Sequence, residues 1–217
     1  MAVWQMESLR CGNSNHTLRG LAEQDQAGFE VDALVGLVDL VPTLVAAAGG
    51  TVTSDIDGRS FLPVLTGNQQ TFRDRIFTTH SADGKMNTYP IRSVRTNRWK
   101  YIRNLQPEAE HHTHIDKGKA VDGNGYWSSW VEQARTDKKA ASIVARYFHR
   151  PAEELYDLEA DPFEQRNLAT DPACATALKG VRADLSKWME EQGDQGMASE
   201  QIAKNAFPKA APKSFTN

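Results

Sequence analysis

The stretch MNTYPIRSVRTNRWKYIRNL, residues 86–105, decides the fold of this chain. It contains two runs rich in β-branched and aromatic residues, 91–96 and 99–103, whose side chains suit packing across paired strands. Between the runs, Asn97-Arg98 is an interruption of the size of a tight turn. The stretch therefore predicts a β-hairpin.

Two shorter segments have the same strand character. Residues 75–79, RIFTT, have the length and β-propensity of an interior strand. The segment PAEELYDLEADPFEQRNLATDP, residues 151–172, contains another short run, 154–158, which ends before the breaker Asp161-Pro162. These runs add to the strands of the hairpin.

Helical patterns follow the strands. Asp171-Pro172 is a strong helix start, with Asp as N-cap and Pro at the first helical position, and Gly193 ends the pattern. The apolar residues between them recur at helical spacing, so one face is expected to pack on the sheet: Leu178, Val181, Leu185, Trp188 and Met189. Residues 126–150 also have a helical pattern, and the tail from Ala203 onward is predicted to be poorly ordered.

Composition excludes several classes of protein. The 217 residues are 40% hydrophobic and 24% charged with a formal charge of −3, which is typical of a globular chain and lacks the basic surface that nucleic acids require. The longest apolar run, Ala33–Ala48, is interrupted by Asp39 and Pro42, so we expect no membrane span. Asp39 can cap a new helical turn, with Pro42 tolerated near the start of that turn. Cys11 and Cys174 lie far apart without metal-like spacing.

Together these segments resemble the C-terminal part of a sulfatase, most like the heparan N-sulfatase (sulfamidase) and arylsulfatase group. The resemblance covers roughly residues 31–192 and is most specific in the block YPIRSVRT, residues 89–96. The run 33–48 is similar to a Val-Asp-Leu-x-Pro-Thr-Leu segment that closes the large α/β domain of the family. Residues 57–67, DGRSFLPVLTG, are similar to a second motif of the family, for which we expect a purely structural role.

The resemblance implies an α+β fold. A small antiparallel sheet of about four strands would be packed by a C-terminal helix and preceded by the last piece of an alkaline-phosphatase-like α/β domain. The expected division is a non-family segment at 1–30, frame-shifted or disordered, a remnant of the α/β domain at 31–71, the C-terminal subdomain at 72–195 and a tail at 196–217.

The family's chemistry needs groups that this chain lacks. A hydrated formylglycine attacks sulfur while Ca²⁺ polarises the sulfate, and the nucleophile lies in a Cys/Ser-x-Pro/Ala-x-Arg motif. No such motif occurs here, and Cys11, in RCGNS, lacks its Pro and Arg. We therefore predict no catalytic residue, no metal ligand and no cofactor in this chain, with calcium and formylglycine belonging to a full-length parent enzyme.

Substrate contact is a separate prediction. In the family the loop that corresponds to 80–87 faces the active-site cleft, which makes His80, Lys85, Asn87 and Arg92 candidates for binding an anionic sugar. Arginine can hold a sulfate or a carboxylate through two parallel hydrogen bonds. The alternative is a solvated loop with Arg92 as an ordinary strand charge. Ala82-Asp83 replaces paired histidines of the sulfamidase group, which argues against heparan specificity.

Two other side-chain clusters have competing interpretations. His111, His112 and His114 suggest zinc, but they are closely spaced without a nearby Cys, and a solvent-facing loop is favoured. Trp127 and Trp130 suggest a sugar-stacking platform, although aromatic residues at helical spacing more often belong to a core.

The leading function is thus the C-terminal fragment of a sulfatase that hydrolyses sulfate esters or sulfamates on sulfated sugars, inactive alone. The alternative is a freestanding module that binds carbohydrate or a partner, and a phosphonate or phosphate hydrolase is a weaker third. The resemblance implies a parent that acts outside the cytoplasm, as periplasmic, secreted or lysosomal sulfatases do. The expected partners are a sulfated sugar and, through the exposed Ala33–Ala48 surface, a second copy of the chain.

Residues 1–28 match nothing in the family and lack hydrophobic periodicity. The codons that Arg19–Gly28 permit, read one base later, can encode a segment similar to the family's sequence just before the apolar run. We therefore predict that residues 1–28 are translated out of frame, form no packed element native to the fold and leave Cys11 without a role.

Overall fold

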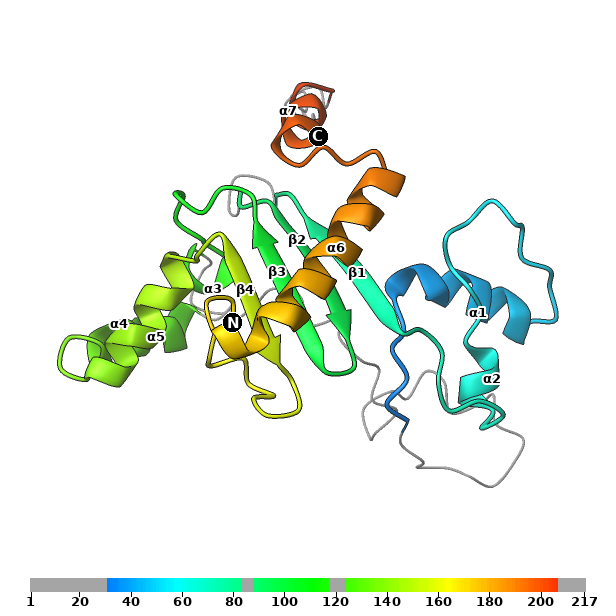
Figure 1. Ribbon diagram of the computed structural model, residues 1–217, viewed down its shortest axis with the longest axis horizontal. Helices are drawn as coiled ribbons and strands as arrows, with labels where there is room; N and C mark the ends of the chain where they lie inside the picture. The colour runs from blue at the N-terminus through cyan, green and yellow to red at the C-terminus, as the bar shows by residue number, and fades with distance from the viewer. Residues whose placement is uncertain (1–30, 83–87, 118–123, 207–217) are drawn as a thin grey trace, which may run out of the picture. The chain divides into compact units, whose positions relative to one another are not determined.

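The computed structural model describes residues 31–82, 88–117 and 124–206 (Figure 1). The out-of-frame segment predicted for 1–28, with Cys11, lies outside these residues. The chain divides into two compact units, one formed by residues up to Ile76 with 95–98 and the other by 77–94 with 99–217. Among the described residues, no helix combines the length and the apolarity that a membrane crossing needs.

The second unit contains most of a four-stranded antiparallel sheet in the order β1-β2-β3-β4. Its strands are β1 (Arg75–His80), β2 (Ile91–Thr96), β3 (Trp99–Asn104) and β4 (Glu153–Asp157). The predicted turn at 97–98 joins β2 to β3, and β4 pairs with β3 in a register that sets Tyr101 opposite Leu155. The predicted hairpin and the two predicted single strands are confirmed.

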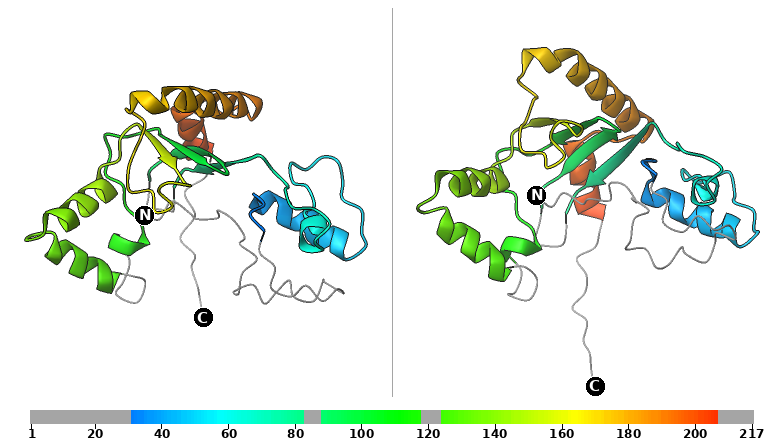
Figure 2. Two further views of the ribbon diagram at one scale, coloured as in Figure 1. Left: turned by 60° about the horizontal axis from the view of Figure 1, so that its bottom comes forward. Right: turned by 90° about the horizontal axis from the view of Figure 1, so that it is seen from below.

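Helix α6 (Ala175–Glu191) lies across one face of this sheet (Figure 2). The predicted start is confirmed, because Asp171 accepts from Ala173 N at 3.0 Å in the short 3₁₀ helix η3 (Pro172–Cys174) that leads into α6. A single buried cluster joins the helix to the sheet, and it consists of Val94, Tyr101, Leu155, Leu178, Val181, Leu185 and Met189. Trp188 stacks on Phe77 with ring centroids 5.0 Å apart. The helix thus covers the apolar face that the alternation of the strands creates.

The opposite side of β3 and β4 carries a buried polar network instead. The Glu154 carboxylate, 4% exposed, accepts hydrogen bonds from Arg150 Nε at 2.8 Å, Asn104 Nδ2 at 2.7 Å and the Tyr156 hydroxyl at 2.6 Å. Burial alone would raise the pKa of Glu154, but the charge and hydrogen bonds of Arg150 lower it overall. A charged carboxylate is therefore built into the interior and fully paired.

Between β3 and β4 the described residues, 105–117 and 124–152, form three helices. These are α3 (His114–Lys117), α4 (Asn124–Gln133) and α5 (Lys138–Phe148). The helical pattern predicted for 126–150 is confirmed over most of its length, and it is divided into α4 and α5 by residues 134–137. Asp137 lies between α4 and α5 and accepts from Lys139 N at 2.7 Å, so its side chain caps a new helix. A second difference is α7 (Met197–Ala206), a helix where a tail was expected.

The first unit is a small cluster around the family's two motifs. It contains the 3₁₀ helix η1 (Leu37–Asp39), α1 (Leu40–Ala47), α2 (Leu62–Leu65) and an antiparallel bridge between Leu34 and Arg73. Its core brings the two motif segments together and consists of Val31, Ala33, Val35, Phe61 and Val64. The structural role expected for residues 57–67 is visible in this packing.

Asp39 joins the pieces of this unit. We expected it to cap α1, but its side chain makes no capping bond to that helix. Its buried carboxylate accepts from Gly36 N at 2.8 Å, Arg59 N at 2.9 Å and Arg73 Nε at 2.8 Å. Gly58 is required beside it, because a Cβ there would lie 1.8 Å from the Val38 carbonyl oxygen. Asp39 of the first motif thus binds the main chain of the second motif at Arg59, and Gly58 of the second motif allows the two segments to come this close.

We expect Glu154→Gln to lower the free energy of unfolding by about 3–5 kcal/mol, because it leaves the buried Arg150 guanidinium without its counter-charge. Urea unfolding followed by circular dichroism measures the loss. Glu190→Gln, which removes an exposed carboxylate from α6, is the matched control and should change stability by less than about 0.5 kcal/mol. Equal effects of the two substitutions would contradict the role given to Glu154.

Candidate functional site

Arg92, a predicted substrate contact, lies on β2 and is only 4% exposed. Its Nη1 donates to two main-chain carbonyls, those of His80 at 3.2 Å and Ile91 at 3.1 Å. Its Nε and Nη2 both donate to the Asp194 carboxylate, and Nη2 also donates to Glu200 Oε1 at 2.6 Å. The guanidinium is therefore fully paired in this structure.

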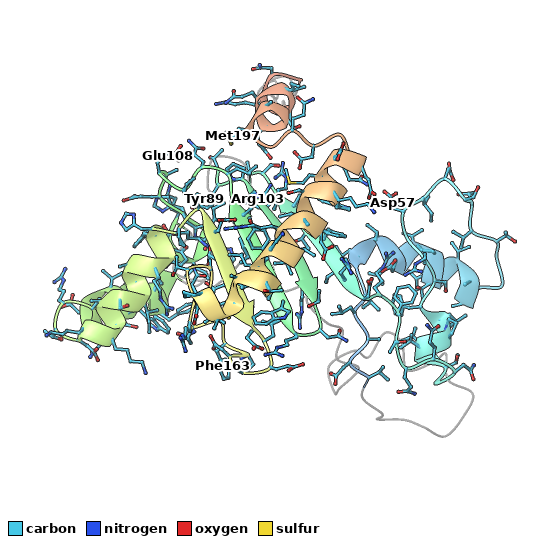
Figure 3. All side chains as sticks on the ribbon, in the orientation of Figure 1. Asp57, Tyr89, Arg103, Glu108, Phe163 and Met197 are labelled. Carbon is cyan, nitrogen blue, oxygen red and sulfur yellow. The ribbon has the colours of Figure 1, made fainter. Side chains whose placement is uncertain are left out.

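The two carboxylates come from the C-terminal end of the chain. Asp194 follows α6, and Glu200 lies in the first turn of α7, whose start is marked by Met197 in Figure 3. Glu200 Oε1 also accepts from the Ser81 hydroxyl at 2.8 Å. Burial would raise the pKa of Asp194, but the hydrogen bonds from Arg92 and Gly196 N lower it overall. Both carboxylates thus act as charged partners of the arginine.

The other predicted contacts lie around this ion-pair cluster or outside the described residues. His80 ends β1, and its carbonyl oxygen holds Arg92. Lys85 and Asn87 fall in 83–87, outside the described residues. The substrate contacts of His80, Lys85, Asn87 and Arg92 therefore stay a prediction, while the structure adds Ser81, Asp194 and Glu200 to the cluster.

The histidine segment is the second candidate. His111 is 1% exposed, so the solvent-facing loop expected for it is wrong. The ring lies edge-on between Tyr89 and Tyr147, with both centroids 5.2 Å away, and Nδ1 donates to the Tyr147 carbonyl oxygen at 3.1 Å. Burial, reinforced by the positive charge of Arg150, lowers the pKa of His111 to about 4. This histidine is a neutral part of the interior.

His112 belongs to a neighbouring hydrogen-bond network. Its Nδ1 donates to Asp116 Oδ2 at 2.6 Å, while Asp116 Oδ1 accepts from Thr113 N at 2.7 Å and from the Tyr147 hydroxyl. His114 is exposed at the start of α3. Over the described part of the chain, no three or more His, Cys, Asp or Glu side chains are grouped so that they could hold a metal ion.

The tryptophan pair divides between its two interpretations. Trp127 is 9% exposed and contacts Tyr147 with ring centroids 4.4 Å apart, as a core residue does. Trp130 stacks on Trp127 at 6.5 Å and stays 42% exposed, and Tyr126, one turn earlier on α4, is 54% exposed. The sequence spacing could not separate the buried ring from the exposed ones, because the burial of Trp127 depends on its contacts with Tyr147 and Phe148 of α5.

Comparison with known proteins identifies the family. The model of the N-sulphoglucosamine sulphohydrolase C-terminal region matches residues 20–120. An ulvan-active sulfatase of Formosa agariphila is 31% identical over 77% of this chain, and the human N-sulphoglucosamine sulphohydrolase is 29% identical over 75%. This chain belongs to the sulfatase family. It matches the C-terminal part of its members, as the resemblance implied.

The chain spans about a third of the length of these relatives, 31% of the Formosa enzyme and 34% of the human one. A solved 2-O GAG sulfatase aligns with 74% of this chain and 26% of its own, at 27% identity and a TM-score of 0.49.

The burial of His111 predicts a pH dependence of stability for this chain. The unfolded state takes up a proton near the ordinary pKa of 6.5, whereas the folded state does so only near 4. Stability from this group is therefore complete above pH 6.5 and is lost as pH falls toward 4, by about 3 kcal/mol in all.

Urea unfolding between pH 7 and pH 4 measures this loss. His111→Gln should flatten the slope in this window, whereas His149→Gln, at an exposed histidine, should keep the slope of the unsubstituted chain. A slope that survives in His111→Gln would show that another group causes it.

Proposed function

We propose that this chain is the C-terminal portion of a sulfatase that hydrolyses sulfate esters or N-sulfate groups on sulfated sugars. The nucleophile and the metal ligands would belong to the remaining part of the enzyme, and the segment described here would complete the substrate side of the site. The chain by itself would then be inactive. The parent enzyme would use calcium and formylglycine and act outside the cytoplasm.

The observation that carries this proposal is the pattern of the match. The relatives named above act, by their names, on ulvan and on N-sulphoglucosamine, and both are aligned with this chain over three quarters of its length. The absence of the Cys/Ser-x-Pro/Ala-x-Arg motif from the sequence agrees with a division of labour. The aligned part supplies binding and structure, and the reaction centre lies elsewhere.

The first unit supports the same division. Leu37, Val38, Val41 and Leu44 on η1 and α1 are between 52% and 64% exposed. Apolar side chains gathered in this way usually mark a surface that another part of a protein covers. We propose that 31–71 is the remnant of the large α/β domain, that 72–195 is the C-terminal subdomain, and that the exposed stripe belongs against the rest of the large domain.

A second candidate is a freestanding carbohydrate-binding module. The exposed rings of Tyr126 and Trp130 favour it, because aromatic faces can stack on sugars. The two candidates differ in what the purified chain does, since a module binds sugars without any other part.

We expect the purified chain to show no turnover of a chromogenic aryl sulfate or of N-sulfoglucosamine with added Ca²⁺, because the nucleophile motif is absent. Calorimetric titration of the chain with N-sulfoglucosamine should show no binding that depends on the exposed ring of Trp130. Turnover above background would overturn the proposed division. Binding that Trp130→Ala abolishes, with Phe163→Ala as the exposed aromatic control, would favour the module instead.

We also expect the chain to self-associate through the exposed stripe on η1 and α1. The double variant Val41→Gln/Leu44→Gln should weaken self-association roughly tenfold or more, since each buried aliphatic side chain contributes about 1.5–3 kcal/mol. Sedimentation velocity over a concentration series measures the change. Phe163→Gln, at a 69% exposed residue of the other unit, should leave association unchanged. A chain that is monomeric at every concentration contradicts the prediction.

A further inference from the structure

The geometry of Arg92 separates its guanidinium into two edges. Nη1 is fixed by the main-chain carbonyls of His80 and Ile91 at 3.2 and 3.1 Å, which set the plane of the group. The remaining edge, Nε and Nη2, faces Asp194, and this is the fork that binds a carboxylate or a sulfate side-on. The fork would keep its orientation if the carboxylates left, because β1 and β2 hold it.

The partner of this fork is weakly attached to the rest of the unit. None of the α7 side chains from Met197 to Asn205 is buried, and Ile202 is 65% exposed. The hydrogen bonds that Glu200 of α7 accepts from Arg92 and Ser81 are polar contacts that water could replace. An element without buried apolar side chains opens at a lower free energy than the packed core.

The connection before α7 has the geometry of a hinge. Gly193 and Gly196 lie on either side of Asp194, each with a φ of +65°. Glycine reaches this region without strain, and residues that absorb backbone rotation often occupy such positions. The segment 194–206 can therefore swing from the end of α6 while the sheet keeps its structure.

We propose that the segment 194–206, which we name the acidic latch, occupies an oxyanion-binding site on Arg92 and is displaced by a sulfate group. When the latch opens, the Nε and Nη2 edge of Arg92 and the Ser81 hydroxyl bind the sulfate of a sulfated sugar. The choice of a sulfate group as ligand rests on the proposed function. The Asp194 and Glu200 carboxylates stand in for that anion in the closed state.

Charge balance makes the two states compete. Opening the latch removes both carboxylate partners of Arg92, so the Nε and Nη2 edge of the open state must pair with water or with another anion. A ligand shifts an equilibrium only by its different affinity for the two states, and sulfate meets the fork only when the latch is open. Sulfate should therefore promote opening, whereas a purely structural ion pair would not respond to it in this way.

Hydrogen exchange on the whole chain tests the proposal without any substitution. Inorganic sulfate, at an ionic strength matched with sodium chloride, should speed amide exchange in 197–206 roughly tenfold, equivalent to about 1.4 kcal/mol. Exchange in α6 should stay the same or become slower, because sulfate generally strengthens folded states. Acceleration confined to the latch is thus the expected result, and unchanged or slower exchange in 197–206 overturns the proposal.

Variants give a second, independent measurement. Asp194→Asn/Glu200→Gln should release the latch and bind inorganic sulfate, glucosamine 6-sulfate and N-sulfoglucosamine by calorimetry at least about tenfold more tightly than the unsubstituted chain. Unsulfated glucosamine should not bind. Glu191→Gln, at an exposed carboxylate near the end of α6, is the matched control and should match the unsubstituted chain. In Arg92→Gln, amide hydrogen exchange in 197–206 should be rapid, and sulfate should no longer change its rate.

Failure of sulfate to bind the released variant, or equal binding after Arg92→Gln, overturns the latch. Neither result touches the proposed function, which rests on the match to the C-terminal part of sulfatases rather than on Arg92. Binding of inorganic sulfate without binding of either sulfated sugar would also contradict the inference, because the site would not accept a sulfate attached to a sugar.

Discussion

The sheet of this chain depends on one buried carboxylate. Glu154 lies on β4 and gathers donors from the segment before the strand, from β3 and from β4 itself. A charge this deep is tolerated because Arg150, Asn104 and Tyr156 all donate hydrogen bonds to it and Arg150 also carries positive charge. The pairing fixes where α5 ends relative to the sheet, since Arg150 follows that helix by two residues. The position of the buried His111 follows from the same arrangement.

The two faces of the sheet are therefore stabilised by different interactions. Under α6 the contacts are apolar. The leucines and valines of α6 recur at the helical spacing that any helix packed on a sheet needs. On the other face, order comes from paired charges and aromatic rings, which tolerate little substitution because an unpaired partner would stay buried. Arg92 is likewise paired with carboxylates, but its partners are Asp194, in the link after α6, and Glu200, in α7, a helix without buried side chains from 197 to 205. Its pairing can therefore be reversible, whereas that of Glu154 cannot.

Much of the fold was predictable from local patterns. The hairpin, both single strands and α6 follow from β-branched alternation, a turn-sized gap and a helix start with a proline. The errors came from residues whose partners are distant. Asp39 was assigned to a helix cap, yet Arg73 and the Arg59 amide bind its carboxylate. His111 was expected in solvent because its neighbours in sequence are polar, and its burial by Tyr89 and Tyr147 depends on segments tens of residues away.

The sequence by itself determined the family, the strands and the apolar face of α6, because these depend on neighbouring residues and on motif spacing. Only the tertiary structure decided which charges are paired. It placed Asp194 and Glu200, 102 and 108 residues beyond Arg92, against a guanidinium that the sequence alone assigned to substrate. No local pattern marks such a pair, since a lone aspartate after a helix and a glutamate in a polar segment look like ordinary surface residues. Asp194 and Glu200 pair with Arg92 because the fold brings the end of the chain back to β2.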